Sequence, residues 1–199
     1  MTDVLIPGGR DVRGTLSEPA GECETVVVAC PPHPQQGGSR SDRRLVAVSE
    51  ALAAAGIACL RFDYGPWDEG NGEREDVRNA VRWAVDRYDR IGLFGYSFGA
   101  TLAVLAATDV DGLDAVAVLA PTARLDDELD AVNAIPALSC PLSVLYGERD
   151  TTADWEPVVE ASRDRGAELR AISADHFFVG QSDRIADEVE SFFARTLGK

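Results

Sequence analysis

The chain has 199 residues, of which 45% are hydrophobic and 27% charged, and one domain over residues 1–199 is the simplest division of that length. Thirty-four acidic residues against 19 basic ones give a net charge of −15. A field of this sign repels nucleic acid and anionic membranes, so neither is expected as a partner. No apolar run approaches the roughly 18 residues of a membrane span, and the start shows no signal-peptide pattern, so we expect a cytoplasmic protein.

The acid excess is the unusual feature of the composition. Of the 19 basic residues 18 are arginine, and the one lysine is Lys199. A GC-rich genome would favour arginine over lysine but leaves the surplus of carboxylates unexplained. Carboxylates keep the surface of cytoplasmic proteins from salt-loving archaea solvated, and this composition resembles theirs. We therefore expect a halophilic protein whose fold is stabilised by salt.

The cysteines show no C-x-x-C spacing, which favours buried free thiols over a disulfide or a metal site. The chain has only two histidines, so a conventional His/Cys metal centre is not expected either. The residues concerned are Cys23, Cys30, Cys59, Cys140, His33 and His176.

Short apolar runs alternate with segments of helical periodicity along the chain. Strands are expected at 24–30, 57–64, 90–96, 113–121, 141–150 and 168–176. Helices are expected over 42–56, with Ser41 or Asp42 as the cap, over 74–90, directly after Ser97, and over 183–197. Strands that alternate with helices predict an α/β fold, a mostly parallel sheet with helices on both faces. Ligands of such sheets bind at the carboxyl ends of the strands.

The pentapeptide GYSFG, residues 95–99, fits the pattern G-x-S-x-G of a nucleophile elbow. Ser97 stands between a predicted strand and a predicted helix, which is the context that this motif requires. There the hydroxyl is presented at a helix N-terminus, where developing negative charge is favoured. The alternative is a serine that only caps the helix, and partners must decide between the two because serine needs a base.

In hydrolases that carry this elbow motif, the triad residues follow one another along the chain as serine, acid and histidine. This order leaves His176 as the base. His176 follows the last predicted strand, and Asp150 closes the strand-like run PLSVLYGERD. Asp154 is an alternative acid, whereas Asp175 is adjacent to His176 and would point elsewhere. A loop histidine and a turn aspartate are the plain alternatives. Three such residues in this order at one sheet edge predict a Ser97–His176–Asp150 triad.

These residues resemble the α/β-hydrolase superfamily over residues 10 to 197, through GYSFG, YGERD and DHFF. The segment PPHPQQGGS, residues 31–39, is similar to a loop of small, lid-less, dienelactone-hydrolase-like proteins. Two departures stand out. Pro31 replaces the usual first histidine of that loop, and the nucleophile is Ser97 where dienelactone hydrolase has cysteine, which argues against dienelactone as substrate. The resemblance implies an α/β-hydrolase fold without a cap domain.

The resemblance also implies an oxyanion hole made by two backbone N–H groups, those of Phe98 and Gln35. Gln35 follows from aligning the pair His33-Pro34 with the superfamily's His-Gly pair. His33 is then expected to shape this loop by hydrogen bonds without transferring protons. We expect three residues to contact substrate: Trp67, Tyr96 and His33.

The sequence thus predicts a serine hydrolase that cleaves a small ester or related acyl bond and needs no metal or cofactor. An acyltransferase, a peptidase and a non-catalytic binding protein of the same fold are the alternatives. The connection at 122–140 is too short for a cap, so the site should be open and its substrate a small molecule. The sequence does not decide whether the protein forms a homodimer.

Overall fold

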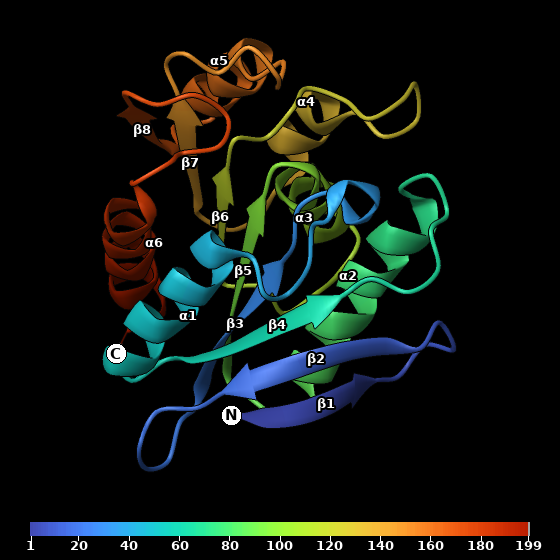
Figure 1. The fold of residues 1–199 in the computed structure, drawn as a ribbon, viewed down its shortest axis with the longest axis vertical. Coiled ribbons are helices and arrows are strands. Elements are labelled where there is room, and N and C mark those ends of the chain that lie inside the picture. Colours follow the sequence, from blue (N-terminus) through green and yellow to red (C-terminus); the bar gives the residue numbers. More distant parts are fainter. Residues whose placement is uncertain (199) are drawn as a thin grey trace.

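The structure, a computed structural model, describes residues 1–198 and is built around an eight-stranded sheet (Figure 1). The strand order is β1-β2-β4-β3-β5-β6-β7-β8. The β1–β2 and β2–β4 pairs are antiparallel, and all other neighbours are parallel. The strands are β1 (Thr2–Ile6), β2 (Val12–Ser17), β3 (Thr25–Cys30), β4 (Ala58–Asp63), β5 (Arg90–Tyr96), β6 (Ala115–Leu119), β7 (Leu142–Gly147) and β8 (Glu168–Ile172).

Helices cover both faces of this sheet, so the predicted mostly parallel α/β architecture is confirmed. Helices α1 and α6 lie side by side on one face, and α2 and α3 lie on the other (Figure 1). Alternate residues of a strand therefore enter two apolar layers: Val26 and Val28 pack with α2 and α3, whereas Val27 packs with α1 and α6. The helices are α1 (Arg43–Ala54), α2 (Asn71–Val85), α3 (Phe98–Ala107), α4 (Ala131–Ala134), α5 (Glu156–Asp164) and α6 (Ser182–Leu197).

The connection at 122–140 holds only α4 and the short 3-10 helix η2 (Ile135–Ala137), so it carries no cap domain, as predicted. Among residues 1–198, no helix is both long and apolar enough to cross a membrane. The four thiols are free; three are buried, and only Cys23 is partly exposed.

Most predicted elements are present, but some boundaries differ. Helix α2 begins at Asn71 rather than 74, because the Glu73 carboxylate accepts the N–H groups of Asp68 and Gly70 and so caps the helix early. Strands β1 and β2 and helix α5 were not predicted. β1 and β2 are antiparallel additions at the edge of the sheet, and only part of each strand is buried.

Candidate active site

Ser97 forms a sharp turn between β5 and α3, with φ 55° and ψ −118°. This conformation is rare for a residue with a side chain and is held by the structure around it. The turn needs glycine on both sides: a Cβ on Gly95 would lie 2.3 Å from the carbonyl oxygen of Gly99. A Cβ on Gly99 would lie 2.4 Å from that of Pro31. The predicted elbow is therefore present, and its two glycines are sterically required.

Hydrogen bonds link Ser97 to two distant residues. The Oγ atom of Ser97 lies 2.8 Å from Nε2 of His176, and Nδ1 of His176 lies 2.7 Å from Oδ2 of Asp150. The three residues follow β5, β8 and β7, whose carboxyl ends meet at one edge of the sheet. The parallel topology thus brings together side chains that are 79 and 26 positions apart in the sequence.

The carboxylate of Asp150 is wholly buried and held in place. Its Oδ1 atom accepts the N–H groups of Thr152 at 2.8 Å and Ala153 at 3.0 Å, which leaves Oδ2 to face His176. Asp154, the alternative acid, is exposed and its N–H donates to Thr122 Oγ1. Asp175 accepts the N–H of Phe177 with its carboxylate. Of the three candidate acids, Asp150 is the one in contact with His176.

Tyr96, directly before Ser97, is nearly buried. Its side chain borders the cavity at Ser97, but the residue is only 2% exposed, and its hydroxyl donates to the carbonyl oxygen of His176 at 2.9 Å. Burial raises the pKa of Tyr96 to about 12, so the phenol keeps its proton and acts as a donor. Its hydroxyl is thus engaged within the protein, and contact of its side chain with substrate stays a prediction.

The loop on the other side of Ser97 contains the 3-10 helix η1 (Pro34–Gln36), which His33 caps. Nδ1 of His33 accepts the N–H of Gln35 at 3.2 Å. Burial lowers the pKa of His33, although Glu73 opposes this, and a neutral imidazole can accept such a bond. His33 therefore shapes the loop by a hydrogen bond, but it does so through the N–H assigned to the oxyanion hole. In this structure the N–H of Gln35 is occupied, and its role as an oxyanion donor stays a prediction.

An aromatic cluster stands beside this loop. The ring of His33 lies 4.7 Å from that of Trp67 and 4.8 Å from that of Phe98, between centroids. Trp67 is 37% exposed and is not one of the residues that line the cavity at Ser97, although its ring contacts His33, which does. Phe98 opens α3, where the first N–H groups of a helix have no partner within it. Its N–H therefore has no partner within the helix, and its role as an oxyanion donor stays a prediction.

The cavity at Ser97 has a volume of about 240 Å³. Arg44, Asp42 and Phe177 also line it. No local pattern assigns Arg44 or Phe177 to the site, and Asp42 was expected only as a helix cap. In the part of the chain that the structure describes, no group of His, Cys, Asp or Glu is arranged to hold a metal. The lining residues are Pro32, His33, Gln36, Gly37, Gly38, Asp42, Arg44, Tyr96, Ser97, His176 and Phe177.

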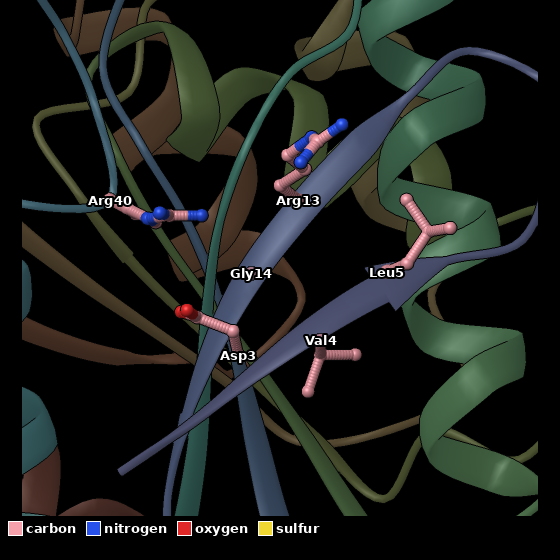
Figure 2. A pocket seen from close by; sticks show the side chains of 6 residues that line it. All are labelled: Asp3, Val4, Leu5, Arg13, Gly14 and Arg40. Atoms are coloured by element: carbon pink, nitrogen blue, oxygen red, sulfur yellow. The ribbon is translucent and has the colours of Figure 1, made fainter.

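A larger hollow of about 320 Å³ lies at β1 and β2 (Figure 2), and Ser97 is not among its lining residues. Its two arginines are paired with acids: Arg13 with Asp11 at 3.0 Å, and Arg40 with Asp63 at 3.5 Å. None of its lining residues is a nucleophile or a histidine, so we place the candidate site at Ser97. The lining residues are Asp3, Val4, Leu5, Arg13, Gly14 and Arg40.

Solved structures share this fold. An alpha-beta serine hydrolase homologue from Coxiella burnetii is 24% identical, with 97% of each chain covered and a TM-score of 0.82. XC6422 from Xanthomonas campestris, an α/β serine hydrolase without lid, is 21% identical over 100% of this chain and 95% of that one, with a TM-score of 0.80. Est1E from Butyrivibrio proteoclasticus is 19% identical over 99% of both chains, with a TM-score of 0.86.

No curated protein matches the chain. Residues 67–191, more than half of the chain, match the model of the Dienelactone hydrolase family. The matched segment includes Ser97, Asp150 and His176. The chain therefore belongs to the dienelactone hydrolase family.

Proposed function

We propose that the protein is a serine hydrolase that cleaves small, neutral carboxylic esters through an acyl-enzyme on Ser97. The observation that carries this proposal is the unbroken chain of hydrogen bonds from Ser97 Oγ through His176 to Asp150, at 2.8 and 2.7 Å. Nucleophile, base and orienting acid are each within hydrogen-bond distance of the next, which is the arrangement that activates a serine.

In the proposed reaction, Nε2 of His176 takes the proton of Ser97 as Oγ attacks the ester carbonyl carbon. Asp150 accepts the Nδ1–H of His176 and stabilises the imidazolium that forms. The N–H of Phe98 binds the developing oxyanion, and that of Gln35 joins it by leaving His33. The imidazolium then protonates the departing alcohol, and a water activated by His176 releases the acid from Ser97.

The proposed substrate class follows from the charges that line the cavity. Arg44 is the one cationic lining residue in the described part of the chain. Its guanidinium already donates to the Asp42 carboxylate and to the carbonyl oxygen of Phe177. A substrate carboxylate would have to displace these partners inside a protein of net charge −15, so neutral esters are favoured. Est1E, a structural neighbour, binds ferulic acid, which supports a carboxylic acid as product.

A fluorophosphonate probe tests the proposal, because it reacts only with an activated serine. We expect one adduct on the peptide that carries Ser97, and none in Ser97→Ala. Failure of the wild-type protein to react would contradict the proposal and favour a binding protein of the same fold. An acyltransferase or peptidase would react too. Turnover of p-nitrophenyl acetate in water without an amine or alcohol acceptor separates the esterase from an acyltransferase, and failure to cleave the matching p-nitroanilide separates it from a peptidase.

The acyl chain length that the enzyme prefers is a further expected outcome. The site has no cap, and each CH₂ left outside the cavity forfeits roughly 0.8 kcal/mol of binding. On p-nitrophenyl esters, kcat/KM should peak between acetate and butyrate. A half-ester of similar length with a free carboxylate should be a poorer substrate than its neutral counterpart. A steady rise in kcat/KM toward long acyl chains would contradict the open site.

A further inference from the structure

Two side chains from outside the loop hold the backbone on which His176 is mounted. The hydroxyl of Tyr96, the last residue of β5, donates to the carbonyl oxygen of His176 at 2.9 Å. Nη1 of Arg44, in the first turn of α1, donates to the carbonyl oxygen of Phe177 at 2.6 Å. Two successive carbonyl groups of the loop are thus fixed by residues of the sheet and of a helix.

These two side chains also support each other. The guanidinium of Arg44 lies 4.4 Å above the centre of the Tyr96 ring, and that ring is stacked on His176 with centroids 5.9 Å apart. The Asp42 carboxylate accepts from Nε and Nη2 of Arg44, and from its backbone N–H at 2.9 Å. Burial opposes the charge of Arg44, but its hydrogen bonds with Asp42 outweigh this and raise its pKa. The planar guanidinium of Arg44 donates to Asp42 on one edge and to the carbonyl oxygen of Phe177 on another, an arrangement that the ammonium of lysine cannot reproduce.

Close to the imidazole, the other hydrogen bonds of the loop are mostly within it, from the N–H groups of Phe177 and Phe178 to Asp175. Phe178 is buried and has a φ of 48°, so the chain turns sharply directly after Phe177. Phe177 itself is 59% exposed and contributes little packing. A shift of this backbone would move the imidazole against Ser97 and Asp150, and a displacement of about 1 Å at a reacting group can cost on the order of 10²-fold in rate.

We propose that Arg44 and Tyr96 are positioning residues that hold His176 between Asp150 and Ser97. The inference rests on the proposed function, in which His176 is the base. It assigns Arg44 to the support of the histidine and not to the recognition of an anionic substrate. It also explains why the tyrosine within GYSFG faces inward, although this motif accepts any residue there.

Tyr96→Phe is the sharpest variant, because it keeps the ring beneath Arg44 and beside His176 and removes only the hydroxyl. We expect kcat on p-nitrophenyl acetate to fall on the order of tenfold, with KM within about twofold of wild type. The rate of fluorophosphonate labelling should fall in parallel, since it depends on the same activation of Ser97. A substrate-binding role would instead raise KM with kcat preserved.

Arg44→Gln should lower kcat similarly, and Arg44→Lys should restore part of the loss, because an ammonium reaches only one of the two acceptors. Arg43→Gln is the matched control: it makes the same change in charge at the exposed neighbouring residue and should leave kcat unchanged. Melting temperatures of all four variants identify any that fail to fold. Should Arg44→Gln be one of these, Tyr96→Phe and Arg44→Lys carry the test.

Proton NMR supplies a readout that a merely structural role would not move. The Nδ1–H that His176 donates to Asp150 should give a downfield signal, absent in His176→Ala, whereas Nδ1 of His33 accepts a bond and has no such proton. We expect this signal to shift and broaden in Tyr96→Phe. If His176→Ala is inactive while Tyr96→Phe and Arg44→Gln keep the wild-type kcat and signal, the positioning role is overturned and the proposed function stands. If His176→Ala stays active, the proposed function itself fails.

Discussion

On one side of Ser97 the His176 imidazole is engaged at both nitrogens and its backbone is tied by Tyr96 and Arg44. On the other side the N–H of Gln35, which was expected to face the substrate oxygen, donates to His33. The residues of the first side are largely buried, whereas Gln35 is exposed. In terms of the proposed function, the half of the site that would transfer the proton is already hydrogen-bonded together, whereas on the oxyanion side the N–H of Gln35 is occupied.

This difference has a physical basis in the two supporting structures. Asp150 and His176 follow strands whose positions are fixed by the parallel ladder, and their side chains are buried. The loop at 31–38 follows β3 but lies near the surface and is shaped by short-range bonds, such as those from Gln36 and Gly38 to the carbonyl oxygen of His33. Preorganised donors lower the barrier to reaction without rearrangement. In the proposed reaction the loop side must rearrange first, because the N–H of Gln35 has to leave His33, and this step costs free energy.

Removing the proposed nucleophile or the proposed base should have the largest effect. We expect Ser97→Ala and His176→Ala each to lower kcat by on the order of 10³-fold or more, with little further loss in the double variant, because the residues act as a unit. Ester hydrolysis followed under saturating substrate measures this. Near-wild-type activity of His176→Ala would contradict the role of His176 as the base and with it the contrast between the two sides of Ser97. His33 is the only other imidazole in the chain.

Asp150→Asn should come next, at a loss on the order of 10²-fold or more in kcat, because an amide no longer stabilises the imidazolium and favours the wrong tautomer. Asp154→Asn is its control, four positions further along the same loop and exposed. Equal losses in the two variants would mean that the buried contact between Asp150 and His176 is not what matters.

The oxyanion side can be tested by removing one N–H. Proline is tolerated in the first turn of a helix, so Gln35→Pro deletes this donor within η1, whereas Gln35→Ala removes the side chain and keeps the N–H. If the N–H leaves His33 for the substrate, kcat in Gln35→Pro should fall by on the order of 10²-fold, as for other single oxyanion donors. Gln35→Ala should stay near wild type. Equal activity of the two folded variants would exclude Gln35 as the second donor.

What the sequence could predict of this site depended on chain order and topology. Ser97, Asp150 and His176 each follow an apolar run, and parallel strands place such positions at one edge whatever the details of packing. The scarcity of histidine left few alternatives. The fold was predictable for the same reason: buried parallel strands are short continuous apolar runs, as in TVVVAC of β3.

The remaining features depend on tertiary contacts that leave no local pattern. Nothing in the residues around Arg44 indicates that its guanidinium reaches a loop 133 positions away. The direction of Tyr96 and the bond between Gln35 and His33 are set by how the loops pack. Helix α5 escaped prediction because nine residues beginning with Glu156 and a proline give too short a periodic pattern.

Salt should change the stability of the fold through the molecular surface but leave the hydrogen bonds of the site unchanged. This is the smallest of the expected effects. With a net charge of −15, self-repulsion among surface carboxylates weakens the fold in dilute buffer, and molar KCl shortens the screening length to roughly 3 Å. Exposed pairs such as Arg195–Glu168 weaken too, but the surplus of acids outweighs them. We propose that this is a salt-stabilised protein and expect the melting temperature to rise by at least a few degrees, since a gain of 1 kcal/mol in unfolding free energy raises it by about 2–4 °C at this chain length.

The bond between Asp150 and His176 is buried and screened much less, so kcat of the folded enzyme should stay nearly constant over the same range. Thermal unfolding and initial rates measured at matched KCl concentrations check both statements. A melting temperature that does not change would refute salt stabilisation and leave the enzyme proposal untouched, whereas a steep fall in kcat would place the bond between Asp150 and His176 within reach of solvent ions.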